Sequence, residues 1–299
     1  MTRARHERDV AVDGGMLRVG LWEADGPDAL TALLVHGVTS SHLVWQFVAD
    51  RLPEMRLIAP DLRGRGRSNT VEGPAGMAAH AADMVAVLDA LGIEQALVVG
   101  HSMGAFVSVV LADLYPERVS GLVLVDGGLP LDVPAGLDPE QVVAHVLGPT
   151  AERLRMRFAS VGEYFDFWRG HPAFQGGWTP ELEEYLSYDL VDDEAGAFRP
   201  ATSYATVVDD TVDMNAGAAL PRALERMRHP VRLLTVDRGL QNEEPGLYSP
   251  AYLAQTLAEY PRVAHTRIDG FNHYTIVMTG QGADIVADAL SDAPTRSSR

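Results

Sequence analysis

The 299-residue sequence contains no cysteine and no lysine, and each absence excludes a set of chemistries. Without cysteine there is no disulfide, zinc–thiolate site, iron–sulfur cluster or cysteine nucleophile. All 24 basic residues are arginine. Schiff-base and pyridoxal-phosphate enzymes, P-loop nucleotide binding and serine–lysine dyads each depend on a lysine, so all are disfavoured. The catalytic classes left open need neither a thiol nor an amine.

Long apolar runs and net positive charge are also lacking. No apolar stretch approaches the roughly 18 residues of a membrane span, and the N-terminus is polar where a secretory signal would be apolar. We therefore expect a cytoplasmic protein with no membrane partner. The formal charge of −17 repels phosphate backbones, so we expect no nucleic-acid partner, although residues 61–68 (DLRGRGRS) are locally basic.

Short apolar runs that end in Gly or Asp alternate with helical patterns along most of the chain. Hydrophobic residues make up 46% of the sequence, as in folded globular proteins. The alternation predicts a mainly parallel sheet covered by helices, and the length suits one large α/β domain with an insertion. The predicted strands span residues 18–24, 31–37, 56–61, 96–101, 119–126, 231–237 and 262–269.

The alternation stops for about 100 residues in the second half of the chain, where no convincing strand is found. Helical patterns separated by Gly, Pro and Asp clusters occupy this stretch near residues 138–157, 161–170, 179–190 and 216–228. We interpret residues 128–228 as an inserted helical cap and residues 1–127 and 229–290 as the core. Residues 291–299 are polar and are expected to be a disordered tail.

The most informative motif is VVGHSMG, in which Gly100, Ser102 and Gly104 satisfy the G-x-S-x-G nucleophile elbow. An apolar strand precedes it and a helical pattern follows, which is the strand–turn–helix setting in which this motif carries meaning. The glycines are needed because neighbouring chain packs too closely for side chains there. Ser102 is therefore the predicted nucleophile.

A serine hydroxyl is a weak nucleophile near neutral pH, so a base must accept its proton. His273 follows the last predicted strand and is the candidate base. An oxyanion that develops on a substrate carbonyl needs amide donors. We expect these from Met103, directly after the nucleophile, and from Val38, in the turn that leaves the strand 31–37.

Five segments follow one another in the order HG (36–37), DLRGRGRS (61–68), GHSMG (100–104), VLVD (123–126) and GFNH (270–273). In this order they resemble the α/β-hydrolase superfamily, in particular its capped esterase and lactonase branch. The resemblance covers roughly residues 8–126 and 229–290 and does not include the insertion.

The resemblance implies an α/β-hydrolase fold with a mostly parallel eight-stranded sheet, its first strand pair antiparallel. It also implies a serine triad at the carboxyl ends of the strands, with no cofactor and no metal. Haloalkane dehalogenases and epoxide hydrolases of the superfamily carry aspartate where this chain has Ser102, so hydrolysis of a carboxylic ester or lactone is favoured. A non-hydrolytic small-molecule receptor and a cofactor-free lyase remain alternatives.

The acid that would orient His273 departs from the common pattern of the family. Most relatives carry it in the loop after the seventh strand, where this chain has Gly and Leu. Asp126, at the end of the sixth strand, occupies the alternative position used by some relatives and is preferred here. Asp237, Glu243 and Glu244 remain alternatives.

The substrate is expected to bind between the core and the cap. Residues 126–229 contain 11 of the 21 aromatic residues, which suggests an apolar pocket for a bulky apolar or macrocyclic ester or lactone. The alternative is that these aromatics form the core of the cap itself. The predicted substrate contacts are His36, Gly37, Trp168 and Trp178.

Overall fold

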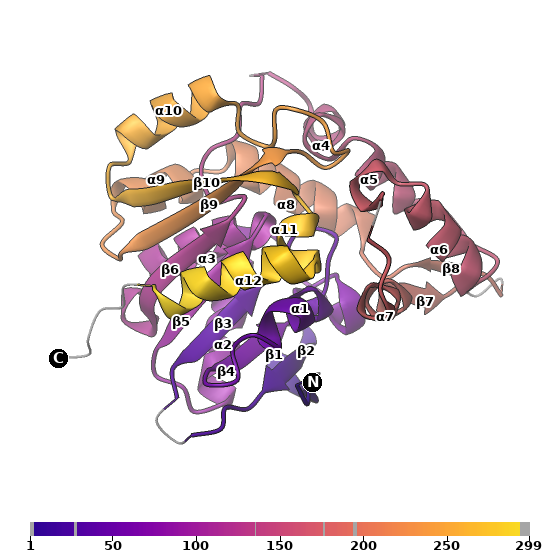
Figure 1. The fold of residues 1–299 in the computed structure, drawn as a ribbon, viewed down its shortest axis with the longest axis horizontal. Coiled ribbons are helices and arrows are strands. Elements are labelled where there is room, and N and C mark those ends of the chain that lie inside the picture. Colours follow the sequence, from indigo (N-terminus) through magenta and orange to yellow (C-terminus); the bar gives the residue numbers. More distant parts are fainter. Residues whose placement is uncertain (1–2, 27–28, 135, 176, 194–195, 294–299) are drawn as a thin grey trace.

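A computed structural model describes residues 3–26, 29–134, 136–175, 177–193 and 196–293. Its centre is an eight-stranded sheet in the order β1-β2-β4-β3-β5-β6-β9-β10 (Figure 1). β2 pairs antiparallel with both neighbours and the other pairings are parallel, so the predicted fold class is confirmed. The strands are β1 (His6–Val12), β2 (Gly15–Trp22), β3 (Thr31–Val35), β4 (Arg56–Pro60), β5 (Ala96–His101), β6 (Val119–Val125), β9 (Val231–Arg238) and β10 (Val263–Asn272).

Helices cover both faces of the sheet because successive side chains of the central strands point to opposite faces. Leu33 and Val35 pack with α2, α3, α9 and α10, whereas Ala32 and Leu34 pack with α1, α11 and α12. The helices of these layers are α1 (Gln46–Ala49), α2 (Met77–Ala90), α3 (Met103–Leu114), α9 (Ala219–Glu225), α10 (Pro250–Glu259), α11 (Thr275–Met278) and α12 (Gly280–Ser291), with 3₁₀ turns η1 (His42–Trp45), η2 (Gly66–Ser68) and η3 (Pro116–Arg118).

The sequence pattern does not predict β1, and the reason is its place at the sheet edge. Val10 is the one residue of this strand that is buried, so no apolar run marks it. Its charged residues Glu7, Arg8 and Asp9 suit an exposed edge, where they discourage pairing with a second chain.

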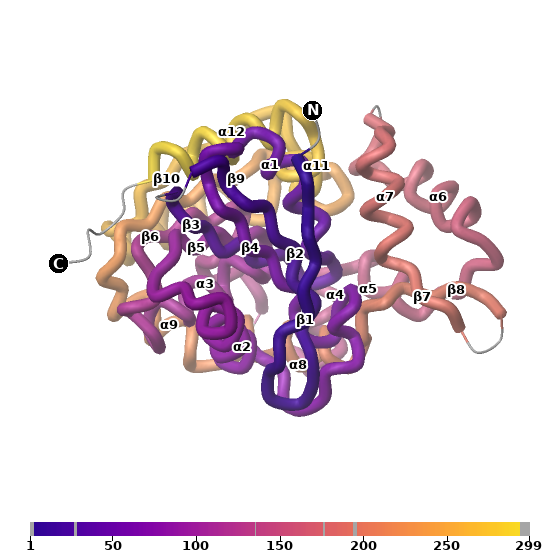
Figure 2. Tube along the Cα trace, turned by 90° about the horizontal axis from the view of Figure 1, so that it is seen from below, coloured from indigo at the N-terminus to yellow at the C-terminus, as the bar shows by residue number. Residues whose placement is uncertain are grey.

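The segment between β6 and β9 lies mainly at the side of the molecule opposite the C-terminus, and α6, α7, β7 and β8 stand farthest from the sheet (Figures 1 and 2). Its last helix, α9, instead packs on α3. The other elements are α4 (Pro139–Leu147), α5 (Pro149–Arg153), α6 (Val161–Arg169), η4 (Pro172–Phe174), α7 (Pro180–Tyr188), β7 (Leu190–Asp192), β8 (Phe198–Pro200) and α8 (Tyr204–Ala216).

Two features of this segment differ from the sequence-based expectation. The hairpin β7–β8 was not expected, and strands of three residues are too short to show an alternating pattern. Helix α8 was not expected either, because its many β-branched residues favour strands. Its N-cap, Ser203, accepts from the Thr206 amide and marks the start of the helix.

Ser291 ends α12, and of the predicted tail 291–299, residues 294–299 lie outside the described residues. Among the helices that the structure describes, none has the length and apolar character needed to cross a bilayer.

Candidate active site

Ser102 stands at the sharp turn between β5 and α3, with backbone angles φ 54° and ψ −128°. Its amide donates to the carbonyl of Val125 at 2.9 Å, which ties the turn to β6. A Cβ at Gly100 would lie 2.3 Å from the Gly104 carbonyl oxygen, and one at Gly104 would lie 2.0 Å from the Val35 carbonyl oxygen. The close packing expected at both glycines is therefore present, and it explains why the turn needs them.

His273 lies in the turn between β10 and α11, and its Nδ1 is 2.6 Å from Oδ2 of Asp126. Both side chains are buried. Asp126 follows β6 directly with φ 46°, and its amide donates to the Leu234 carbonyl at 2.7 Å. A carboxylate accepts the Nδ1 proton, which leaves the lone pair of the ring on Nε2.

The other three carboxylates considered for this role contact different partners. Asp237 accepts from the amides of Gly270 (2.9 Å) and Phe271 (3.2 Å), so it supports the irregular end of β10. Glu243 accepts from the Gln241 amide, and Glu244 pairs with Arg238. Of the four, Asp126 is the carboxylate in contact with His273.

His101 is a site residue to which the sequence analysis assigned no role. Its Nε2 is 2.9 Å from the His273 carbonyl oxygen, and the two rings lie 4.8 Å apart between centroids. Burial, with His273 nearby, lowers the pKa of His101 well below its usual value, so the ring stays neutral and Nε2 donates the bond. His101 therefore holds the backbone of His273. Its position inside the GHSMG motif was the available signal.

The two predicted oxyanion amides are those of Met103 and Val38, and both residues line the cavity described below. Met103 is the first residue of α3, so its N–H has no partner within the helix. The Gly37 carbonyl oxygen is 2.8 Å from Nδ1 of His36 and accepts from the Ser40 amide at 3.3 Å. Because the peptide is trans, the N–H of Val38 points away from these two donors.

His36, an expected substrate contact, is fully buried, and it is not among the described residues that line the cavity described next. Its Nε2 accepts from the Leu62 amide at 2.9 Å, so the proton is on Nδ1 and is donated to Gly37. Burial lowers the pKa of His36 to about 4, and the ring is fully enclosed. Gly37 itself does line the cavity described next.

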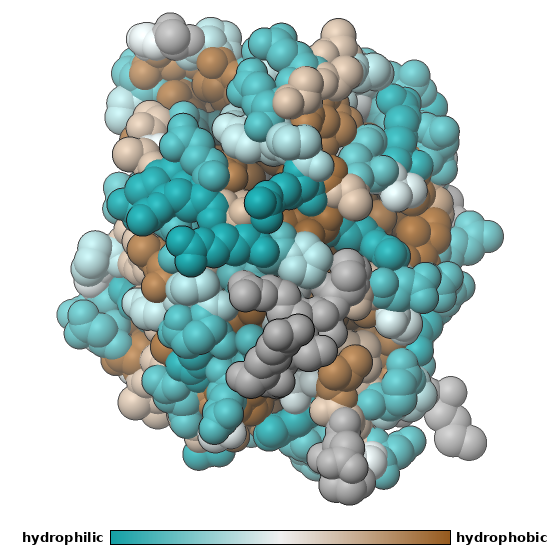
Figure 3. Space-filling model, turned by 90° about the vertical axis from the view of Figure 1, so that its left-hand side faces the viewer, coloured by the Kyte–Doolittle hydropathy of each residue, from teal (hydrophilic) through white to brown (hydrophobic). Residues whose placement is uncertain are grey.

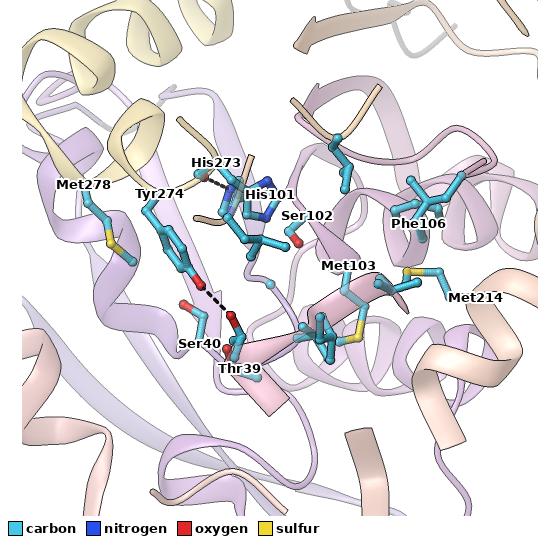
Figure 4. A pocket seen from close by; sticks show the side chains of 18 of the residues that line it. Thr39, Ser40, His101, Ser102, Met103, Phe106, Met214, His273, Tyr274 and Met278 are labelled. Atoms are coloured by element: carbon cyan, nitrogen blue, oxygen red, sulfur yellow. Dashed lines mark hydrogen bonds between the residues drawn. The ribbon is translucent and has the colours of Figure 1, made fainter. Parts of the chain in front are cut away.

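A cavity of about 40 Å³ lies against Ser102 and His273, and Figure 4 shows both side chains with that of His101 among the residues that line it. Burial raises the pKa of Tyr185 and Tyr274, so their hydroxyls stay protonated as donors. No arginine or carboxylate side chain is among the described residues that line this cavity. The lining consists of Gly37, Val38, Thr39, Ser40, His101, Ser102, Met103, Phe106, Leu131, Val146, Leu147, Thr150, Tyr185, Met214, Leu240, Leu247, His273, Tyr274 and Met278.

Trp168 and Trp178 do not line this cavity, contrary to the expectation from the sequence. Trp168 is buried among aromatic rings of the inserted segment, with Arg153 over its face. Trp178 donates from Nε1 to Glu183 at 2.7 Å. Both therefore serve packing within the segment. The segment contributes six other residues to the lining instead: Leu131, Val146, Leu147, Thr150, Tyr185 and Met214.

No group of three or more histidine and carboxylate side chains in the described part of the chain is arranged to hold a metal ion.

Comparison with known proteins agrees with this geometry. The sheet order and the strand–serine–helix turn define a hydrolase-type α/β architecture. A family model described as alpha/beta hydrolase fold matches residues 33–194, more than half of the chain. The chain belongs to the α/β-hydrolase fold family.

Two curated relatives share part of the sequence. Lipase LipV of Mycobacterium tuberculosis is 39% identical over 116 residues, which cover 39% of this chain and 43% of the relative. Epoxide hydrolase 2 of Siraitia grosvenorii is 38% identical over 95 residues, 30% of each chain. The chain thus spans less than half the length of these relatives.

Solved structures resemble the chain over almost its full length. The structure of E-2-(acetamidomethylene)succinate hydrolase aligns with a TM-score of 0.75 and 22% identity, covering 97% of this chain and 98% of the other. A thioesterase domain from the curacin biosynthetic pathway aligns with a TM-score of 0.76 and 21% identity, covering 97% and 100%. At these identities the likeness shows the fold.

Proposed function

We propose that the protein is a serine hydrolase that cleaves a carboxylic ester or a lactone through an acyl-enzyme on Ser102. The observation that carries the proposal is the buried contact of 2.6 Å between His273 and Asp126, at the cavity into which Ser102 opens. In this assignment His273 is the general base and Asp126 holds its ring in the tautomer that accepts from serine.

In the first half-reaction Oγ of Ser102 attacks the ester carbonyl while its proton moves to Nε2 of His273. The amides of Val38 and Met103 donate to the oxyanion of the tetrahedral intermediate. The intermediate collapses, the carbon–oxygen bond breaks, and His273 returns the proton to the leaving alcohol. Water then attacks the acyl-enzyme with the same proton transfers, which releases the acid and restores Ser102.

The cavity supports an uncharged acyl group of modest size. Its described lining carries no cationic side chain, so a second carboxylate on the acyl group would be buried without a partner. A volume of about 40 Å³ is far below the several hundred Å³ of sites for drug-sized ligands. We therefore propose a short or medium apolar acyl group in place of the bulky or macrocyclic one expected from the sequence.

We further propose that residues 128–228 act as a cap over Ser102. Helices α4, α5, α7 and α8 of this segment each contribute at least one lining residue, opposite the core residues of β5, α3 and the β10–α11 turn. The cap would exclude water from the oxyanion and set the length of the acyl group that fits.

Labelling with a fluorophosphonate, followed by hydrolysis of aryl esters from acetate to octanoate beside small and macrocyclic lactones, tests the proposal. We expect labelling and ester turnover in the parent chain and neither in Ser102→Ala. Ser108→Ala is the matched control, because Ser108 lies buried in α3, the helix that Ser102 precedes, and its hydroxyl donates to the Gly104 carbonyl. Labelling that persists in Ser102→Ala, or is lost in Ser108→Ala, contradicts the assignment. Labelling without ester or lactone turnover would direct attention to amide or carbon–carbon bonds.

A further inference from the structure

Arg65 lies in the loop 61–68 after β4, and its side chain is fully buried. Its Nε donates to the carbonyl of Val38 at 2.9 Å, and Nη1 donates to the carbonyl of Arg63 at 2.9 Å. Nη1 also pairs with Oδ2 of Asp210 at 2.5 Å. A guanidinium group so far from solvent requires such partners, because an unpaired buried charge is costly.

Asp210 belongs to α8 of the inserted segment and is also fully buried. Its Oδ1 accepts from the Gly76 amide at 2.6 Å and lies 3.0 Å from Nε2 of His80. Burial alone would raise the pKa of Asp210, but Arg65 and His80 hold it below the usual value. The carboxylate is therefore charged, and the link between α8 and the loop is ionic.

On the core side, Arg65 determines the conformation of the turn that carries one oxyanion amide. The peptide before Val38 is fixed through the Gly37 carbonyl, which His36 and Ser40 hold. The peptide after Val38 is fixed through its own carbonyl by Arg65. With both peptide planes held, the direction of the Val38 N–H is set.

On the other side, Asp210 determines the position of a cavity wall. Asp210 and Met214 are four residues apart on α8 and share one helix face, and Met214 lines the cavity. The same loop also contacts the start of α8, because the Ser203 amide donates to the Gly64 carbonyl at 2.8 Å. The loop and α8 thus form one docked unit that reaches from the turn to the cavity wall.

We propose that Arg65 is a positioning residue: through its pair with Asp210 it holds the oxyanion turn and α8 in a single arrangement. The proposal rests on the esterase function proposed for Ser102. The transition state needs the Val38 amide in place, whereas binding of a short ester depends on the whole apolar lining, to which α8 contributes one of the described residues, Met214. Loss of the pair should therefore lower kcat more than it raises KM.

The test uses the double variant R65M/D210L, which replaces the ion pair by apolar side chains. Removing both charges together avoids leaving one of them buried alone. With an acetate ester we expect kcat to fall by about 10- to 100-fold, the scale of a misplaced catalytic group, with KM changed by less than about threefold. Parent-like kcat in the folded double variant overturns the proposal.

The matched control is R63M/D83L, two residues away in the same loop. Arg63 and Asp83 form a two-contact pair, with both distances 2.7 Å and side chains 5% and 4% exposed. Arg63 otherwise donates to carbonyls of residues 13, 72 and 74, away from the oxyanion turn. We expect parent-like kcat in this control. An equal loss of kcat in both double variants means that loop stability, and not positioning, is responsible.

Two further measurements keep the proposal decidable. If R65M/D210L does not fold, R65K is measured in its place. Lysine keeps the positive charge, but its single ammonium group cannot donate to Val38 and pair with Asp210 as a planar guanidinium does, so kcat should still fall. Parent-like kcat in R65K overturns the proposal. If the parent hydrolyses no ester, the proposed function fails separately. Amide hydrogen exchange of residues 36–41 then tests the positioning role of Arg65. Exchange should be faster than in the parent in R65M/D210L but not in R63M/D83L, and equal exchange rates in the two double variants overturn that role.

Discussion

At the scale of single residues, the proposed chemistry depends on which nitrogen of His273 carries the proton. Asp126 lies 2.6 Å from Nδ1 and receives its proton, so Nε2 is the ring nitrogen whose lone pair can accept a proton. An asparagine at 126 can instead donate to Nδ1, which moves the proton to Nε2 and removes the base. The carboxylate also stabilises the imidazolium that forms when Ser102 is deprotonated.

We therefore predict that Asp126→Asn loses on the order of 10² or more in kcat while the protein stays folded. Asp237→Asn is the comparison, since Asp237 supports the amides of Gly270 and Phe271 and not His273. It should lose little turnover. Steady-state kinetics with circular dichroism as a folding check measures both, and the reverse order of effects would move the acid to the end of β9.

A second prediction concerns pH. Only neutral His273 accepts the serine proton, so kcat/KM should rise with pH and reach a plateau. Burial lowers the pKa of His36 to about 4 and holds that of His101 well below its usual value, so neither ring is expected to add a second ionisation near neutral pH. The acid limb should consequently show one ionisation, with a slope of one in a plot of log kcat/KM against pH. A slope of two would mean that a second group near the site titrates.

The site residues differ in how far the sequence could predict them. Ser102 and the oxyanion amides follow from a local motif whose strand–turn–helix setting is visible in the sequence. The contact between Asp126 and His273 joins residues far apart in the chain, so the sequence left several carboxylates open. The side-chain roles of His36 and Trp168 could not be predicted, because composition does not tell which face of an element borders the cavity.

At the scale of elements, a buried carboxylate of the core bonds to the end of α7. Asp61, directly after β4, accepts from the hydroxyl of Tyr188 at 2.7 Å, from the Arg67 amide at 2.9 Å and from His42. Tyr188 is the last residue of α7. The tyrosine therefore ties the end of α7 to the loop that also carries Arg65.

We predict that Tyr188→Phe lowers the free energy of unfolding by about 1.5–3 kcal/mol, the usual worth of a hydrogen bond to a charged group. The aromatic ring stays, so its contacts with His42 and Arg67 are kept. Urea unfolding followed by tryptophan fluorescence measures the change. An unaltered midpoint would show that the hydroxyl is solvated equally well in the unfolded chain.

How well the sequence predicts a helix or strand depends on the length of that element and on how much of it is buried. Strands such as β5 and β6 are almost wholly buried and give continuous apolar runs, so the pattern located them within a residue or two. The edge strand β1 and the three-residue strands β7 and β8 carry too little apolar signal. Helix α8 runs against its own propensities, and its packing against α4 compensates.

At the scale of the whole molecule, the net charge of −17 is the dominant surface property. Figure 3 shows polar side chains across the face that it displays, with apolar side chains in small groups between them. A strongly negative surface attracts cationic solutes over distances comparable to the Debye length, about 8 Å at physiological salt, and repels anionic ones.

For esters with the same acyl group we accordingly predict a charge-dependent effect of salt. The kcat/KM for butyrylcholine should fall severalfold as ionic strength rises from about 0.02 to about 0.3 M, because screening removes the attraction. The uncharged isostere 3,3-dimethylbutyl butyrate should change little and is the control. Equal responses of the two esters would show that the net charge does not reach the site.

The positive φ angles of Ser102 and Asp126 lower thermal stability at two residues on which turnover is proposed to depend. Positive φ in a residue with a Cβ costs roughly 1–3 kcal/mol, and the surrounding fold has to sustain it. Glycine at either position would relieve that cost and make the protein harder to melt, while removing a hydroxyl or carboxylate on which turnover is proposed to depend. A mutant library selected for thermal tolerance alone would drift toward glycine at both positions, so directed evolution of this scaffold must select for turnover in every round.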